Sequence, residues 1–213
     1  MIERPLLEQV GRRFARLTTN AVVRRPAAWR VFRRLMRLQF DRLAPRWDAM
    51  RDPGHLASFE RALAAVDRSP RRALDLGTGT GAAAFAIARR FPEAEVVGVD
   101  LAAGMIEEAR RKTPDDLAER VRFDQGDAAR LPFAEGSFGL VALANMIPFF
   151  GELARVVEPG GAVIFSFSGG SATPIFVATE RLREALEPRG FSGFDEFAAG
   201  QGTAVLAWKR PGS

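Results

Sequence analysis

The chain has 213 residues and no cysteine. This absence excludes disulfide bonds, a thiol nucleophile, cysteine-ligated iron–sulfur clusters and the radical chemistry that such clusters support. There is one histidine, His55, so a metal site built from several histidines is excluded and no metal is expected. Tyrosine is also missing, so no tyrosine hydroxyl can orient a reacting group.

Long apolar segments are missing as well. No run approaches the roughly 20 apolar residues that a helix needs to cross a bilayer, and the first residues lack the apolar region of a signal peptide. Hydrophobic residues still make up 47% of the chain, which is enough for a sizeable core. We therefore expect a cytoplasmic protein with one domain, residues 51–213, that follows an amphipathic, helical N-terminal extension, residues 1–50.

The positive charge is concentrated in that extension. Residues 1–51 hold 13 arginines and 4 acidic residues, whereas the rest of the chain holds 18 basic and 22 acidic residues. The high isoelectric point, about 10.9, is therefore a property of the extension and not of the domain.

Residues 26–44 predict an amphipathic helix. One broad side carries apolar residues, and the other carries charged ones: Trp29, Phe32, Leu35, Met36, Phe40 and Leu43 against Arg30, Arg33, Arg34, Arg37 and Asp41. Such a helix can cap the core, lie on a membrane surface or contact nucleic acid. Nucleic acid is the least favoured, because no interleaved aromatic and basic motif is present.

The most informative stretch is residues 73–81, which read ALDLGTGTG. Its first four residues fit a short strand of a covered parallel sheet. Gly77, Gly79 and Gly81 leave room for a ligand to approach the backbone. Residues 82–90 are strong helix formers with basic residues at the end. The combination predicts a nucleotide-binding turn, and the alternative is a tight turn without a ligand.

Two classes of nucleotide compete for this turn. Gly77, Gly79 and Ala82 satisfy the dinucleotide fingerprint of a nicotinamide-dependent reductase. A dinucleotide would place a pyrophosphate on the loop, and the carboxylate of Asp75 would repel it. A ligand with an ammonium and a sulfonium, such as S-adenosylmethionine, would not be repelled.

Further strands follow in a regular order. Residues 95–100 end in Asp100, whose carboxylate can accept hydrogen bonds from both ribose hydroxyls. Four more strands are predicted at residues 121–128, 137–144, 162–167 and 191–198, and the last at 203–209. Residues 177–189 fit a helix that ends at Gly190.

With these motifs in this order, residues 45–210 resemble a class I S-adenosylmethionine-dependent methyltransferase of the ubiquinone/menaquinone type and related small-molecule enzymes. Residues 75–81 match the glycine-rich motif, Asp100 matches the acid that binds ribose, and residues 126–128 match the adenine-contacting motif. Residues 153–161 resemble the stretch before the fifth strand. Residues 40–48 resemble the segment before the core, in which an aromatic residue, here Trp47, lies near the cofactor.

The resemblance implies a Rossmann-like α/β fold. It is a doubly wound, seven-stranded, mostly parallel sheet between two helical layers, and its antiparallel last strand is inserted beside the fifth. The resemblance also implies S-adenosylmethionine as cofactor, with Asp127 at the adenine amino group. The implied cofactor-binding residues are Trp47, Asp75, Gly77, Thr78, Gly79, Gly81, Asp100, Leu101, Met105, Gly126, Asp127, Ala128 and Asn145.

The methyl acceptor is less well defined. His55 is a candidate general base, with a surface or helix-end histidine as the alternative, and Asn145 is a candidate substrate contact. An apolar pocket for a small, apolar acceptor is expected from Trp47, Met50, Met146, Phe149, Phe150, Phe167 and Phe176. Two departures from the family pattern are Gly139, in place of an acid, and a short connection over residues 145–159, which predicts a more open acceptor side. A non-catalytic cofactor-binding protein is the alternative function.

Overall fold

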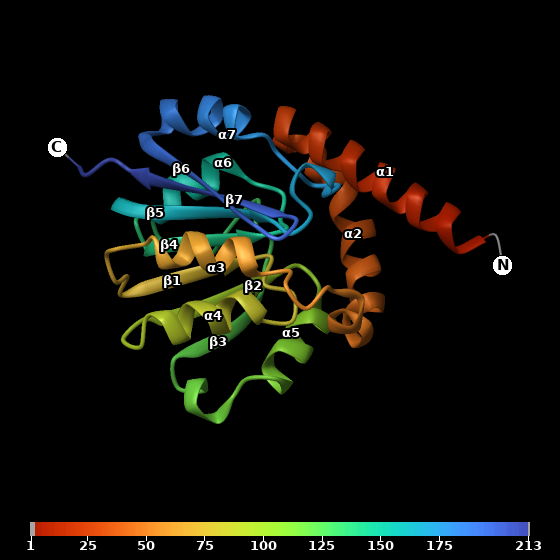
Figure 1. Cartoon of the computed structure of the whole chain (residues 1–213), viewed down its shortest axis with the longest axis horizontal. Helices are drawn as coiled ribbons and strands as arrows, with labels where there is room; N and C mark the ends of the chain where they lie inside the picture. The colour runs from red at the N-terminus through yellow and green to blue at the C-terminus, as the bar shows by residue number, and fades with distance from the viewer. Residues whose placement is uncertain (1–2, 213) are drawn as a thin grey trace.

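The computed structural model describes residues 3–212, with side chains from residue 11 onward, and a seven-stranded sheet forms its centre (Figure 1). The strand order is β3-β2-β1-β4-β5-β7-β6. The first five strands are parallel, whereas β7 is antiparallel to both β5 and β6. The predicted sheet is confirmed. Its strands are β1 Arg72–Leu76, β2 Glu95–Asp100, β3 Val121–Gln125, β4 Phe138–Ala144, β5 Val157–Phe167, β6 Phe191–Ala199 and β7 Gly202–Lys209.

Seven α-helices surround the sheet (residues 3–212; Figure 1). Those of the extension are α1 Glu3–Arg24 and α2 Trp29–Leu43, followed by short 3-10 turns at Ala44–Arg46 and Asp48–Met50. The others are α3 Ala57–Ala64, α4 Ala82–Arg90, α5 Ala103–Arg111, α6 Phe150–Val156 and α7 Thr179–Leu186.

The strands are buried on both faces, because their side chains alternate between two hydrophobic clusters. In β2, Val97 and Val99 join the cluster that contains α6 and α7, whereas Val96 joins the cluster that contains α3 and α4. Residues Trp29 and Met36 of α2 belong to the first cluster. The extension therefore packs on the same core as the strands.

The structure corrects the predicted helix in the extension. The helix begins at Trp29 rather than residue 26, because Pro26 opens a separate 3-10 turn. Trp29 and Met36 are buried as expected, but Leu35 is 53% exposed and does not lie on the packed side. The longer helix α1 agrees with the helical character predicted for the extension, but its bounds were not predicted.

Three other boundaries differ. The third strand ends at Gln125, so residues 126–128 form a loop. The fifth strand begins at Val157 and contains the predicted turn, with Gly160 at a φ of 76°. The last helix ends in a 3-10 turn before Gly190, which has a φ of 88° and ends the helical segment as expected.

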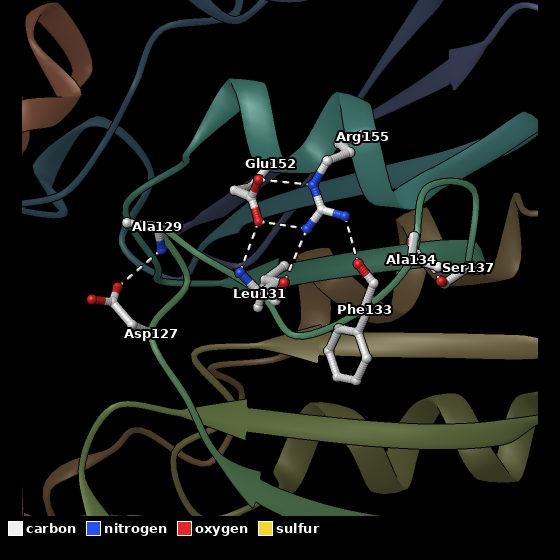
Figure 2. Close-up of polar contacts among 8 residues, drawn as sticks. All are labelled: Asp127, Ala129, Leu131, Phe133, Ala134, Ser137, Glu152 and Arg155. Carbon is white, nitrogen blue, oxygen red and sulfur yellow. Dashed lines mark hydrogen bonds and ion pairs between the residues drawn. The ribbon is translucent and has the colours of Figure 1, made fainter.

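One side-chain network holds the long loop between β3 and β4 (Figure 2). Arg155 of α6 donates hydrogen bonds to the carbonyl oxygens of Phe133 (2.5 Å) and Leu131 (3.0 Å). Glu152 pairs with Arg155 at 2.7 Å and accepts a hydrogen bond from the Leu131 N–H at 2.7 Å. The Arg155 guanidinium holds the pKa of the Glu152 carboxyl below its usual range. The ionised form of Glu152 therefore adds to the attachment of the loop to α6 that the Arg155 hydrogen bonds to its carbonyl oxygens provide.

We predict that Glu152→Gln lowers the free energy of unfolding by about 1.5–3 kcal/mol at pH 7, the usual size of a hydrogen bond to a charged group. Because the folded-state pKa is lowered, this contribution is present above the ordinary glutamate pKa of about 4.3. It is lost as the pH falls through the folded-state value. Urea unfolding at pH 7 and below pH 4 measures the difference.

Glu180→Gln is the matched control, because Glu180 is exposed and forms no ion pair within residues 11–212. Its free energy of unfolding should change by less than about 0.5 kcal/mol. An equal effect of Glu152→Gln at both pH values would contradict the role of the ion pair.

Candidate functional site

A cavity of about 490 Å³ lies at the carboxyl ends of β1, β2 and β4, the edge at which open α/β sheets bind ligands. Residues from the glycine-rich loop, β2 and the β4 end form part of its lining. The rest comes from α1, α2, residues 47–56 and the loop after β5. The cavity therefore joins the extension to the sheet.

The glycine-rich loop presents bare backbone to this cavity. Gly77 has a φ of 74°, and a Cβ atom there would lie 2.7 Å from Sδ of Met146. Gly79 has a φ of 54°, and a Cβ atom there would lie 3.2 Å from Nε1 of Trp47. Side chains at these two positions would crowd Met146 or Trp47 and occupy the part of the cavity beside the loop. Glycine is therefore needed for both the backbone conformation and the free space.

Asp75 ends β1 as a fully buried carboxylate. Its Oδ2 accepts hydrogen bonds from the Thr78 hydroxyl (2.6 Å) and the Ala84 N–H (3.0 Å). Oδ1 is buried and has no hydrogen-bond partner among the described residues. Burial raises the pKa of Asp75 to about 6. Because Asp75 also lines the cavity, the remaining oxygen fits a cationic ligand group.

Asp100 lies at the end of the neighbouring strand β2. Its Oδ2 accepts a hydrogen bond from the Gly79 N–H and its Oδ1 from the Ala102 N–H, both at 2.9 Å. Burial raises the pKa of Asp100. A carboxylate oxygen can accept more than one hydrogen bond, so both oxygens fit a ribose diol. Leu101 and Met105 line the cavity beside it.

Asp127 is oriented differently from the expectation. Its carboxylate accepts hydrogen bonds from Nε1 of Trp29 (2.7 Å), Nη1 of Arg33 (3.3 Å) and the Ala129 N–H (3.0 Å; Figure 2). Asp127 does not line the cavity, whereas Trp29 and the neighbouring residues 126 and 128 do. Contact of Asp127 with adenine stays a prediction, and the structure places it as the partner of α2.

Gly81 is the other predicted residue outside the cavity lining. It lies at the start of α4 with a φ of 92°, and a Cβ atom there would lie 2.8 Å from Cζ of Phe123. Its position is explained by packing between α4 and β3. Thr78 and Ala128 do line the cavity, as predicted.

The segment after α2 covers the glycine-rich loop. Trp47 lines the cavity, packs edge-to-face on Phe40 at 5.4 Å, and lies 4.9 Å from the guanidinium carbon of Arg51. Asp48 accepts a hydrogen bond from the Thr80 hydroxyl (2.5 Å) and pairs with Lys112 at 2.7 Å. These contacts hold the segment after α2 against the glycine-rich loop and against α5.

Asn145 follows β4 in a left-handed conformation, with a φ of 57°. Its Oδ1 accepts a hydrogen bond from the Ser168 N–H (3.0 Å), and its Nδ2 donates to the Ser168 hydroxyl (3.1 Å). Such a conformation costs of order 1–3 kcal/mol and needs this support. The side chain that was predicted to contact substrate is thus held against the loop after β5, at the cavity wall.

His55 lines the same cavity. Its Nδ1 lies 2.9 Å from the Asp52 carbonyl oxygen. Because a carbonyl can only accept, Nδ1 carries the proton and Nε2 of the neutral ring is an acceptor. Burial lowers the pKa of His55, so the neutral form is favoured at pH 7.

The apolar lining differs from the prediction. Trp47, Met50 and Met146 line the cavity, but four predicted phenylalanines do not. Phe149, Phe150 and Phe167 are buried in the core, and Phe176 packs against that core. The missing lining comes instead from Trp29, Met36, Phe40, Ile147 and Ile175, together with Arg12 and Ala15 of α1.

The amphipathic pattern of α2 had identified Trp29, Met36 and Phe40 as inward-facing, but gave no signal that they face a cavity. Nothing in the sequence marked Arg12 and Ala15 as residues that line a cavity. Residues of α1 thus form part of the wall at the acceptor side, which the short connection over residues 145–159 had predicted to be open.

The polar groups of the cavity fit S-adenosylmethionine. The unpartnered Oδ1 of Asp75 suits an ammonium, and the two Asp100 oxygens suit a ribose. The bare backbone at Gly77 and Gly79 leaves room for the part of the ligand that connects the ammonium to the ribose.

Comparison with known proteins agrees with this fit. A family model described as a methyltransferase domain matches residues 73–161. The chain is 40% identical over 140 residues to a demethylmenaquinone methyltransferase of Thermus thermophilus, which covers 59% of this chain and 62% of that protein. It is 39% identical over 152 residues to a malonyl-[acyl-carrier protein] O-methyltransferase of Halorhodospira halophila, with 64% and 49% covered. The chain thus spans about half to two thirds of these curated relatives.

Among solved structures, an S-adenosylmethionine-dependent methyltransferase from Aquifex aeolicus superposes with a TM-score of 0.63 at 16% identity. The match covers 78% of this chain and 97% of that one. This similarity supports the fold. The strand order, the order of the motifs and the matching family model agree on a methyltransferase domain of the class I type over residues 73–161.

Proposed function

We propose that this protein transfers a methyl group from S-adenosylmethionine to a small, apolar acceptor. The observation that carries the proposal is the buried, unpartnered Oδ1 of Asp75 beside a loop of bare backbone in a largely apolar cavity. A buried charge without a partner is unfavourable, and a cationic cofactor would supply that partner. When bound, S-adenosylmethionine supplies an electrophilic methyl group on a sulfonium.

The chain's residues suit both charges of the cofactor's amino-acid end. Asp75 offers a carboxylate oxygen for the ammonium. The Arg51 guanidinium lines the same cavity and forms no ion pair within residues 11–212. Burial lowers the pKa of Arg51, and a carboxylate would offset that cost. Asp75 and Arg51 would therefore hold the amino-acid end by opposite charges.

The rest of the cavity suits the acceptor. Met36, Phe40, Ile147 and Ile175 provide apolar walls, which exclude water and align an apolar molecule with the methyl group. Nε2 of His55 is an acceptor in the neutral ring and can take a proton from a hydroxyl acceptor. Two relatives are named for a demethylmenaquinone and a malonyl-acyl carrier protein, which supports a methyl acceptor of the small-molecule class.

Calorimetry of the full chain with S-adenosylmethionine, S-adenosylhomocysteine and NADH tests the cofactor. The two adenosyl ligands should bind and NADH should not. A transfer assay with radiolabelled cofactor against lipid-phase and soluble metabolite pools then tests the activity. Binding of NADH alone would overturn the proposal, and cofactor binding without transfer to any pool would identify a non-catalytic binding protein.

The pKa of Asp75 predicts a pH-dependent affinity. The ionised carboxylate attracts the cationic ligand, and this form decreases below a pKa of about 6. The association constant for S-adenosylhomocysteine should be nearly constant above about pH 7 and fall by up to about tenfold per pH unit below about pH 6. Calorimetry between pH 5 and 8 measures this slope.

Asp75→Asn should bind weakly at every pH and lose most of the slope. Asp52→Asn is the matched control, because Asp52 lines the cavity but is exposed. It should keep the wild-type profile. A wild-type profile that is flat from pH 5 to 8 would rule out Asp75 as the partner of the ammonium.

We also propose that the outer face of α2 contacts a membrane surface. Val31, Leu35 and Leu38 form a stripe on this helix and are 76%, 53% and 43% exposed. The exposed arginines 30, 34 and 37 lie beside the stripe. Exposed apolar residues flanked by arginines are typical of helices that lie in an anionic interface. Within residues 3–212, no helix has the length and apolarity needed to cross a bilayer.

Replacement of Val31, Leu35 and Leu38 together by Ser tests this contact. The wild-type chain should float with vesicles that contain phosphatidylglycerol, and the triple variant should float at least about fivefold less, since buried apolar area drives such binding. Leu17→Ser, which removes an exposed leucine of α1, should have a smaller effect. Equal flotation of the wild type and the triple variant would refute the contact.

A further inference from the structure

A second cavity, of about 410 Å³, adjoins the first. Six residues line both: Arg12, Asp52, His55, Ser168, Thr173 and Pro174. The residues that only the second cavity contacts are glycines, Ala172 and Gln201, and none of them has a large apolar side chain. The apolar cavity therefore continues into a polar one.

Arg12 lies at the junction of the two cavities. Its Nη2 donates a hydrogen bond to the Ala172 carbonyl oxygen at 2.7 Å. Arg16, one turn further along α1, donates to the carbonyl oxygens of Ser171 and Thr173, both at 3.1 Å. The neutral carbonyls hold both guanidinium groups in place, and no acid among the side chains of residues 11–212 pairs with their charge.

None of the acids that line the first cavity, Asp48, Asp52, Asp75 and Asp100, forms an ion pair with Arg12. Asp75 and Asp100 lie at the ends of β1 and β2, in the cofactor half, and Asp48 pairs with Lys112. In the part of the chain whose side chains are described, Asp52 is the one carboxylate on the lining of the second cavity. Within the described residues, Arg12 and Asp52 are thus the charged side chains on that lining, Arg16 lies one turn away from Arg12, and burial lowers the pKa of His55.

We infer that the acceptor carries a carboxylate, which Arg12 binds at the junction while the apolar part of the acceptor fills the first cavity. The inference rests on the proposed function and names its substrate class. One of the five guanidinium N–H donors is used on Ala172, and those that remain match a carboxylate. Arginine also keeps its charge at any ordinary pH.

The test compares matched ligands on the full chain saturated with S-adenosylhomocysteine. Octanoate, 1-octanol and octylamine share one apolar chain and differ in charge. In calorimetry, octanoate should bind at least about tenfold more tightly than 1-octanol, about 1.4 kcal/mol, and octylamine should bind least tightly. Raising the salt concentration should reduce this preference, because the guanidinium is partly exposed to solvent.

Variants of α1 assign the preference to one residue. Arg12→Gln should reduce it to about twofold or less, and Arg12→Lys should restore part of it. Arg13→Gln is the matched control: it removes the same charge from an exposed neighbour that lines neither cavity. It should keep the wild-type preference.

Several results would overturn the inference: no preference for octanoate in the wild type, no binding of any of the three ligands, or a preference that survives Arg12→Gln. An equal loss in Arg13→Gln would also overturn it, because net charge alone would then explain the effect. If Arg12→Gln does not fold, Arg12→Lys and the salt dependence of the wild type still decide. Loss of S-adenosylhomocysteine binding, measured in the same experiment, would instead overturn the proposed function.

Discussion

The structure depends most on one carboxylate, Asp75, that is buried where strand, loop and helix meet. Oδ2 takes the Thr78 hydroxyl and the Ala84 N–H, so it joins the end of β1 to the glycine-rich loop and to the first turn of α4. These bonds fix the loop in the open shape that presents its backbone. Because they use only one oxygen, they leave the other buried and unpaired. The hydrogen bonds of Oδ2 therefore fix the conformation of the loop, and the unpaired Oδ1 is the atom that fits a cationic ligand.

Three other carboxylates join the N-terminal extension to the rest of the structure. Asp41 accepts a hydrogen bond from the Gly104 N–H at 2.9 Å, Asp48 pairs with Lys112, and Asp127 accepts the Trp29 indole N–H. The first two bonds join the extension to α5, which follows β2, and the third joins it to the loop after β3. The basic extension is thus built into the walls of the site, with most of its arginines left on the outer surface.

The fold, and the position of Asp75 and Asp100 at one edge of the cavity, could be predicted because their signals are local. Asp75 and Asp100 each follow a short apolar strand, and parallel strands bring their carboxyl ends to one edge. The acceptor half depends on how α1 and α2 cross that edge, which no local pattern gives. Arg12 is an ordinary surface arginine in the sequence. Phe149 follows a strand end as Met146 does, yet its side chain packs into the core.

Helix α2 has two sides with different surroundings: Trp29, Met36 and Phe40 line the cavity, and Val31, Leu35 and Leu38 face outward. A single rigid helix that takes part in two surfaces couples them thermodynamically. Any free energy by which a ligand in the cavity tightens the docking of α2 must reappear, with equal magnitude and sign, in the affinity of whatever its outer surface binds. The occupancy of the cavity and the occupancy of the outer surface of α2 are then two linked equilibria.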